Sequence, residues 1–203
     1  MQLLTPELKL YSFGFVIVAI LFLLVWLIVR QIKKNADIRK ISQTIRTIGS
    51  AHIEDVIIPD EIDGYVTVDY CVLTSNGIVA ILMQNYTGNL FGGDVIDSWT
   101  QVYNHKSYQF DNPLRHREKC LIALQEYMPH VPVMVQVVFA DSGYFPKGKP
   151  SHVSMLSDLQ TDVNALLQTA ECKRDKIKTA WRKLEALKWS DSAKGRSASI
   201  TTS

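Results

Sequence analysis

Two side chains with the potential for chemistry lie on neighbouring β-type segments of the chain. Asp69 stands in a stretch where apolar and polar residues alternate, and Gln84 follows the apolar run of residues 78–83. A carboxylate such as Asp69 is a ligand for a hard cation such as Mg²⁺. The amide of Gln84 can hydrogen-bond a phosphate or a water molecule. Asp69 and Gln84 are therefore the candidate site residues of this chain.

The pattern around these residues predicts a β-hairpin. Asn76-Gly77 separates the two β-type segments and supplies the positive φ angles that a type I′ turn requires. The strands should therefore pair antiparallel, with Asp69 opposite Leu82 and Gln84. Leu82 has no lone pair to offer to a cation. Asp69 then has two interpretations: it ligates a metal ion, or it is a single strand carboxylate that accepts a hydrogen bond or faces water. We favour the second.

The hairpin resembles the core of the nuclease-related domain (NERD) family, a branch of the PD-(D/E)XK restriction-endonuclease-like superfamily. The family pattern is Ile-Asp-His, a short hairpin with a glycine, and then Glu-x-Lys-Asn-Tyr-x-Gly. The positions that match this pattern are Asp69, Asn85, Tyr86 and Gly88. Leu82 stands in place of the glutamate and Gln84 in place of the lysine. The resemblance implies an α/β fold of the restriction-endonuclease-like type, with a mixed β-sheet flanked by helices.

The two departures bear directly on activity. Nucleases of this type hold Mg²⁺ between two carboxylates, one from each strand, with a cation beside them. Leu82 cannot ligate, and Gln84 carries no charge to stabilise the developing negative charge. The family usually carries a further glutamate on a preceding helix, and this chain has none there. Asp37 lies too early in the sequence to replace it. The carboxylates that could instead reach the site from other segments are Asp94, Asp97, Asp111 and Glu118.

Further landmarks of the family follow the hairpin. Trp99 stands where family members commonly have a tryptophan, and Asn112-Pro113 stands where they open a helix. Asn112 can cap the free N–H groups of that helix, while Pro113 occupies its first position. His116, one turn later, is read as a solvated or hydrogen-bonded side chain. The nearly continuous apolar run of residues 131–140 predicts a strand covered on both faces.

The N-terminal part of the chain predicts a membrane anchor. Residues 11–29 contain no charged side chain and are long enough to cross a bilayer core of about 30 Å as a helix. Trp26 stands near the end of this segment, as an interfacial aromatic residue does. The apolar segment runs directly into Arg30 without a small-residue cleavage site, so it predicts an uncleaved anchor rather than a signal peptide.

Charge and cysteine content predict the orientation of this anchor. The basic residues that follow it are Arg30, Lys33, Lys34, Arg39 and Lys40. Basic residues mark the cytoplasmic side, so we expect a single-pass protein of the inner or plasma membrane with its N-terminus outside and its C-terminal domain in the cytoplasm. The chain's three cysteines are widely and irregularly spaced, which suits reduced thiols. The net charge of +2 indicates that any polyanion-binding surface must be local.

The C-terminal part predicts a basic amphipathic helix over residues 171–189. Ile177, Leu184 and Leu187 recur at helical spacing, with Trp181 on the same stripe. The cations proposed to contact nucleic acid or membrane are Lys173, Arg174, Lys176, Lys178, Arg182 and Lys183. Three interpretations stay open: the helix packs its apolar stripe on the domain, lies on the anionic inner leaflet, or binds a nucleic-acid backbone.

These observations combine into one domain organisation. The predicted segments are a short N-terminal segment (1–10), a transmembrane helix (11–29), a basic juxtamembrane linker (30–37), a NERD-like domain (38–168), the basic helix (171–189) and a disordered tail (190–203). The expected function is that of a catalytically degenerate, membrane-anchored module that binds nucleic acid or docks onto a membrane-associated protein complex. It needs no cofactor, and no small-molecule substrate is indicated. The alternative is a metal-dependent nuclease with a rearranged site, in which Asp69 would hold Mg²⁺.

Overall fold

A computed structural model describes residues 20–27, 40–60, 64–167 and 173–198. The chain divides into two units, residues 1–43 and residues 44–203. In the first unit residues 20–27 are helical and expose their large apolar side chains to solvent, Phe22 most of all. The rest of the predicted anchor and the whole predicted linker (30–37) lie outside the described residues. Within the described part of the chain, no helix is both long enough and apolar enough to span a membrane.

The second unit is built on a mixed five-stranded sheet, which confirms the predicted sheet type. Its strands are β1 (Ala51–Asp60), β2 (Gly64–Leu73), β3 (Ile78–Gln84), β7 (Val133–Phe139) and β9 (Val153–Met155), in the order β1-β2-β3-β7-β9. The first three strands pair antiparallel, whereas β3, β7 and β9 pair parallel. β7 lies inside the sheet, as its continuous apolar sequence predicts.

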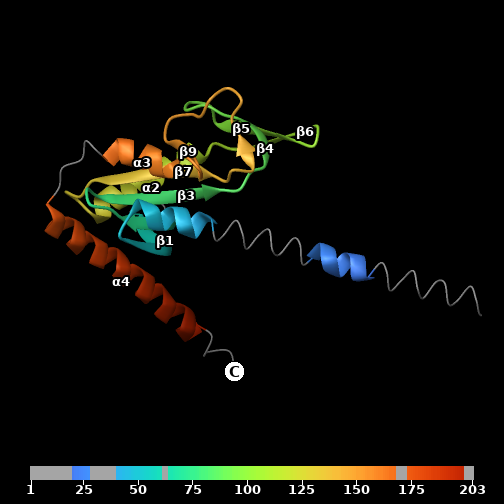
Figure 1. Ribbon diagram of the computed structural model, residues 1–203. Coiled ribbons are helices and arrows are strands. Elements are labelled where there is room, and N and C mark those ends of the chain that lie inside the picture. Colours follow the sequence, from blue (N-terminus) through green and yellow to red (C-terminus); the bar gives the residue numbers. More distant parts are fainter. Residues whose placement is uncertain (1–19, 28–39, 61–63, 168–172, 199–203) are drawn as a thin grey trace, which may run out of the picture. The chain divides into compact units, whose positions relative to one another are not determined.

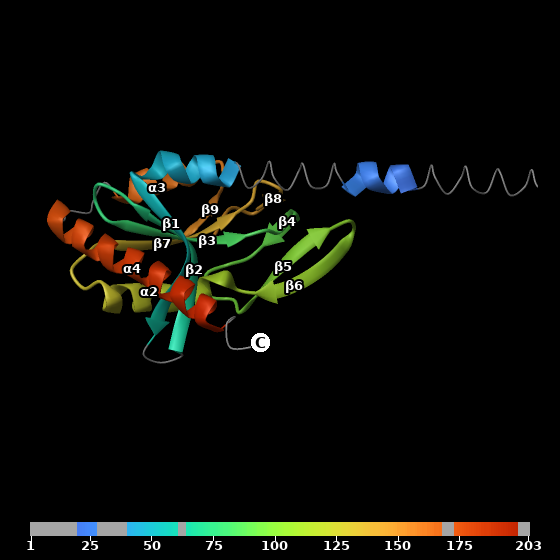
Figure 2. The same ribbon diagram turned by 90° about the horizontal axis from the view of Figure 1, so that it is seen from below.

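A second, smaller sheet lies beyond the end of β3 (Figure 2). Its strands are β4 (Gly88–Phe91), β5 (Ser98–Tyr103), β6 (Lys106–Asp111) and β8 (Gly143–Tyr144), in the order β6-β5-β4-β8. Trp99 of β5 is fully buried and packs against Phe110, Phe139 and Phe145. Because Phe139 belongs to β7, these aromatic rings join the two sheets.

Helices cover both faces of the five-stranded sheet (Figures 1 and 2). α2 (Pro113–Tyr127) and α4 (Arg174–Ala198) cover one face, and α3 (Leu159–Leu167) lies with the helical residues 44–48 on the other. The predicted cap of α2 is confirmed: the side chain of Asn112 accepts a hydrogen bond from the N–H of Leu114 at 2.9 Å, and Pro113 opens the helix. The Asn112 amide also donates to the carbonyl of Ile96 at 2.7 Å, so the cap fixes the preceding loop.

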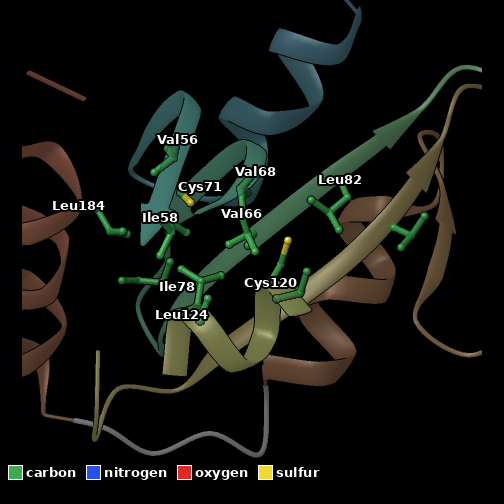
Figure 3. Packing of buried hydrophobic residues seen from close by; sticks show 14 of the residues in the cluster. Val56, Ile58, Val66, Val68, Cys71, Ile78, Leu82, Cys120, Leu124 and Leu184 are labelled. Carbon is green, nitrogen blue, oxygen red and sulfur yellow. The ribbon is translucent and has the colours of Figure 1, made fainter. Parts of the chain in front are cut away.

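The main core lies between the sheet and the α2 and α4 layer (Figure 3). The buried side chains of α4 are Ile177, Ala180, Trp181 and Leu184. Among the three interpretations of the basic helix, packing of the apolar stripe on the domain is therefore the one that the structure shows. α4 runs to Ala198, past its predicted end at residue 189. Extending an existing helix costs far less than nucleating one, which explains why a weakly helical sequence continues it.

The Asn-Gly prediction is wrong in its turn type. Four residues connect β2 and β3, and neither Asn76 nor Gly77 has a positive φ angle. Thr74 closes the loop, because its N–H and hydroxyl both donate to the carbonyl of Gly77, at 3.0 and 2.7 Å. Gly77 is required for another reason: a Cβ there would lie 2.4 Å from the carbonyl oxygen of Pro132. The turn between β5 and β6 instead has two positive φ angles, at Asn104 and His105.

A short polar chain is buried on the α3 face of the sheet. The amide of Gln136 donates to the hydroxyl of Ser154 at 2.9 Å, and this hydroxyl donates to a carboxylate oxygen of Asp162 at 2.5 Å. Gln136 and Ser154 are both buried, and the Oε1 atom of Gln136 has no hydrogen-bond partner among the residues that the structure describes. A buried polar atom without a partner lowers the free energy of unfolding.

Opposite effects are therefore expected from substitutions at the two buried positions. Ser154→Ala leaves the Gln136 amide without its acceptor and should lower the free energy of unfolding by about 1–3 kcal/mol. Gln136→Met removes the unpaired oxygen together with its donor, and should be neutral or stabilising. Urea unfolding of the two variants beside the wild type measures both values. If Gln136→Met lowered the free energy of unfolding as much as Ser154→Ala does, the Oε1 atom of Gln136 would have to accept a hydrogen bond in the folded protein.

Candidate functional site

Asp69 lies where strands β2 and β3 separate. The ladder between them ends at the pair Tyr70 and Ile81. One residue further, the Oδ2 atom of Asp69 accepts a hydrogen bond from the backbone N–H of Met83 at 2.7 Å. The carboxylate thus takes the place of the strand carbonyl that would otherwise pair with Met83. The structure brings Asp69 to the end of β3 that the hairpin prediction named, and gives its carboxylate a backbone partner there.

Leu82 and Gln84, the other two positions of the family pattern, differ in environment. The Leu82 side chain is 2% exposed and belongs to the main core, whereas Gln84 is partly buried at the last position of β3. Figure 3 shows Leu82 among the packed apolar side chains of this layer. The place of the metal-binding glutamate is therefore filled by a hydrocarbon side chain, and no second carboxylate enters from β3.

A second carboxylate approaches Asp69 from β1 instead. Asp55 stands opposite Asp69 in the register that pairs Glu54 with Tyr70 and Val56 with Val68. Its φ of 53° is left-handed, and this conformation interrupts the regular alternation of β1. Asp55 lies close enough for its negative charge to act on the Asp69 carboxyl group. Neither the motif nor the alternation pattern predicts that Asp55 lies near Asp69. This proximity depends on a local shift in the alternation of buried and exposed residues along β1.

The pKa of Asp69 is raised by its surroundings. Partial burial of the carboxyl group is the largest cause, and it is opposed by the hydrogen bond from Met83. The negative charge of Asp55 raises the pKa further, and His116 of α2 lowers it. The proton affinity of this carboxyl group is thus set by burial and by two ionisable neighbours. Folding favours its protonated form, so the wild type should gain stability relative to Asp69→Asn as the pH falls through the folded pKa.

His116 and Cys120 complete the set of ionisable groups around Asp69. The Nε2 atom of His116 lies 3.1 Å from the carbonyl oxygen of Thr67 and 3.4 Å from the Sγ atom of Cys120. Since a carbonyl oxygen only accepts, this nitrogen carries the proton in that contact. His116 is therefore hydrogen-bonded to β2, one of the two states predicted for it. The i, i+4 spacing of His116 and Cys120 on one helix face was the available signal for this pairing.

The surroundings of Cys120 favour its protonated thiol despite the histidine neighbour. Burial, followed by the negative charge of Asp69, raises its pKa to about 12. Burial likewise raises the pKa of Cys71 to about 12. A thiol with such a pKa is about one part in ten thousand thiolate at pH 8, and the thiolate is the nucleophile.

Alkylation should therefore be slow at both buried thiols. In a Cys172→Ser chain at pH 8, we expect iodoacetamide to modify Cys71 and Cys120 at least about a hundredfold more slowly in the folded protein than in urea. Mass spectrometry of timed samples gives the two rates. Rapid modification of Cys120 in the folded chain would instead reveal a thiolate activated by His116.

The four other acidic residues considered from the sequence have different surroundings. Asp94 accepts hydrogen bonds from the backbone and hydroxyl of Ser151, and Asp97 forms an ion pair with Arg115 at 2.8 Å. Asp111 lies at the end of β6, and Glu118 is exposed on α2. None of the four contributes to the pKa shift of Asp69. In the described ranges no group of three or more histidine, cysteine or acidic side chains is arranged to hold a metal ion. The residues present do not fit a two-carboxylate Mg²⁺ site of the family type.

The remaining matches to the family pattern have structural roles. The ring of Tyr86 stacks on Phe110 with a centroid distance of 4.0 Å. Gly88 has a φ of 92°, and a Cβ there would lie 2.6 Å from the carbonyl oxygen of Val102. Only glycine accommodates both conditions. The motif residues after Gln84 therefore fix the transition from the large sheet to the small one.

The six predicted cations are all exposed at the N-terminal end of α4. They are Lys173, Arg174, Lys176, Lys178, Arg182 and Lys183. They lie on α4 or directly before it, whereas Asp69 lies on β2. The structure thus keeps the candidate site and the basic surface as separate features of the domain.

Comparison with protein families matches residues 33–140 to the nuclease-related domain, NERD, over more than half of the 203-residue chain. The match begins before the predicted domain start at residue 38 and ends with the strand β7 and its following residue. Comparison with curated proteins and with solved structures gives no match. The family match, the mixed sheet and the hairpin that carries Asp69 agree with one another, and the chain belongs to the NERD family.

Proposed function

We propose that this NERD domain is catalytically degenerate and acts as a nucleic-acid-binding module at a membrane. The observation that carries the loss of activity is the pair of positions on β3: Leu82 is buried where the family has its glutamate, and Gln84 replaces the lysine. The carboxylate of Asp69 is moreover bound to the N–H of Met83. A carboxylate with this partner serves the fold by satisfying a strand end.

Nucleic acid is favoured as the partner because of the charge on α4. Its apolar stripe is used for packing, and the six cations are exposed on the rest of its surface, with the acidic Asp175 among them in the first turn. Lys and Arg side chains bind phosphates without reading sequence, and such binding weakens steeply with salt. A membrane-associated protein complex is the competing partner, and its binding would depend much less on salt.

The membrane location rests on residues 11–29 and on the basic residues that follow them. The exposed apolar side chains of residues 20–27 are consistent with a helix whose surroundings are lipid. The domain would then face the cytoplasm of a cell with an inner or plasma membrane. Extraction with alkaline carbonate should leave the full chain in the membrane fraction, and deletion of residues 11–29 should release it.

A combined cleavage and binding assay tests the proposed function. The full chain in detergent, wild type beside Asp69→Ala, is incubated with single- and double-stranded DNA and RNA in Mg²⁺ or Mn²⁺, with an active family member as control. We expect no cleavage by either protein. Binding should weaken steeply and continuously as salt rises, and replacing Lys173, Arg182 and Lys183 by glutamine should reduce its salt dependence.

One specific observation supports the alternative of a rearranged nuclease. Asp55 places a second charge beside Asp69, so these two carboxylates are the pair that a relocated metal ion would use. Cleavage that requires a metal ion and disappears in both Asp69→Ala and Asp55→Asn would establish that alternative. Cleavage that survives either substitution would point to a contaminating nuclease.

A further inference from the structure

A groove of about 600 Å³ opens at the end of the domain where β2 turns into β3. Its walls come from the segment before β1, the loop between β2 and β3, α3 and the first turn of α4. The lining includes Leu73, Ser75, Asn164, Arg174, Ile177 and Lys178. None of them belongs to the cluster around Asp69. The volume lies in the range of small-molecule sites, which is about 300–1,000 Å³.

The charge that faces this groove is positive. Arg174 and Lys178 stand four residues apart on α4, which places them on the same side of the helix, and both line the groove. The acidic residue of the first turn, Asp175, lines a different cavity of about 360 Å³ together with Lys176 and Lys183. The described residues that line the larger groove include no carboxylate. The groove therefore favours an anionic ligand over a neutral or cationic one.

The other lining residues are of two kinds. Ser75 and Asn164 are exposed and offer a hydroxyl and an amide group at the rim, while Ile48, Leu73 and Ile177 supply apolar surface. Of these three apolar residues, Leu73 is half-buried, whereas Ile48 and Ile177 are buried and reach the groove with little of their surface. Apolar surface with a few polar groups at fixed positions is typical of sites for small organic ligands. An inorganic anion alone would leave the apolar walls uncovered. The lining thus suits an anion that is attached to a larger, partly apolar body.

Hydrogen bonds hold the walls of the groove in place. The N–H of Ser50 donates to the carbonyl of Leu73 at 2.9 Å, and the loop that contains Ser75 is closed by Thr74 and Gly77. A Cβ at Gly49 would lie 2.3 Å from the same Leu73 carbonyl, so the two segments are in close contact. A wall that is rigid before binding needs little ordering when a ligand enters.

From this combination of size, charge and lining, we propose that the groove binds a phosphorylated small molecule of mononucleotide size. Arg174 and Lys178 bind the phosphate, Ser75 and Asn164 contact the polar part of the ligand, and the apolar wall packs against its ring. This site is independent of the degenerate nuclease centre. It also differs from the polyanion surface of α4, because it requires a defined cavity as well as positive charge.

The experiment measures binding of AMP, ATP and inorganic phosphate to the full chain in detergent by isothermal titration calorimetry. One variant, Arg174→Gln with Lys178→Gln, removes the two charges of the groove. Its matched control, Lys176→Gln with Lys183→Gln, removes two exposed charges from the same helix at the neighbouring cavity. A third variant, Ser75→Trp, obstructs the groove without changing charge. Thermal unfolding of each variant confirms that it is folded.

Saturable binding of one AMP or ATP per chain is expected, with inorganic phosphate binding more weakly. The groove variant and Ser75→Trp should each weaken nucleotide binding at least about tenfold, as loss of charge-assisted contacts does, and the control pair should change it less than twofold. If the groove variant is unfolded, Ser75→Trp decides the question.

The proposal is overturned if no nucleotide binds saturably at millimolar concentration. It is also overturned if the groove pair and the control pair weaken binding equally, since that result indicates diffuse attraction by α4. Binding of a single-stranded oligonucleotide, measured in parallel, separates this proposal from the proposed function. Both charge pairs should weaken oligonucleotide binding alike, whereas Ser75→Trp should leave it intact.

Discussion

Replacing Leu82 by glutamate is expected to destabilise the domain by about 3–5 kcal/mol and to create no nuclease. The substitution restores the family's residue type, but the Leu82 side chain is 2% exposed and packs in the main core. A carboxylate at that position has lost its water without gaining a cation. Asp69 follows the last β2–β3 pair, Tyr70 and Ile81, on the other side of the hairpin and is acidic as well, so it adds repulsion. Such a loss is a large share of the total stability of a typical domain.

Urea unfolding of Leu82→Glu, followed by circular dichroism, measures this effect. Leu82→Met is the matched control, because it keeps volume and polarity and should cost less than about 1.5 kcal/mol. Both proteins are also unfolded in the presence of Mg²⁺. Suppose that Mg²⁺ restored the stability of Leu82→Glu and that the variant then cleaved DNA. A usable metal site would then still exist, and a single substitution would be enough to restore nuclease activity.

Trp99→Ala is expected to lower the free energy of unfolding by about 3–5 kcal/mol. The indole is fully buried, stacks against Phe139 at a centroid distance of 6.1 Å and meets Phe145 edge-on. Its Nε1–H donates to the carbonyl of Gly93 at 3.1 Å, so the substitution also releases the loop before β5. The cavity left by the indole would lie between the two sheets. It should therefore destabilise the contact between them more than the five-stranded sheet itself.

Hydrogen exchange combined with urea unfolding distinguishes these two consequences. Exchange should accelerate most in β4, β5 and β6, while β3 and β7 stay protected. Trp99→Phe keeps an aromatic ring but loses the hydrogen bond to Gly93, and should cost about 1–2 kcal/mol. A uniform acceleration across both sheets in Trp99→Ala would show instead that the two sheets unfold as one unit.

Elements with a strong local cause were predictable from the sequence. The strand β7 follows from an unbroken apolar run, and the start of α2 follows from the capping chemistry of Asn112 and Pro113. The packing of α4 follows from the spacing of Ile177 and Leu184, although its end at Ala198 does not. In each case the residues that determine the element lie within it.

Features that depend on contacts between distant segments were not predictable in the same way. The small sheet requires β4 to pair with β8, two short segments separated by residues 92–142, and neither carries a strong strand pattern. Gly77 is set by the approach of Pro132 rather than by a turn type. Asp55 comes near Asp69 only because the alternation of buried and exposed residues along β1 is interrupted at Asp55. The candidate position of Asp69 could thus be named from its motif, but its neighbours could not.

The left-handed conformation of Asp55 also bears on how copies of the protein behave toward one another. β1 is the ten-residue outer strand of its sheet, and an outer strand offers unpaired N–H and C=O groups to any extended chain that meets it. A residue with a φ of 53° and a negative charge in the middle of that strand breaks the row into two short pieces. An added strand could not stay in register across it. The left-handed residue that places a charge near Asp69 is thus also the kind of feature with which proteins discourage edge-to-edge pairing.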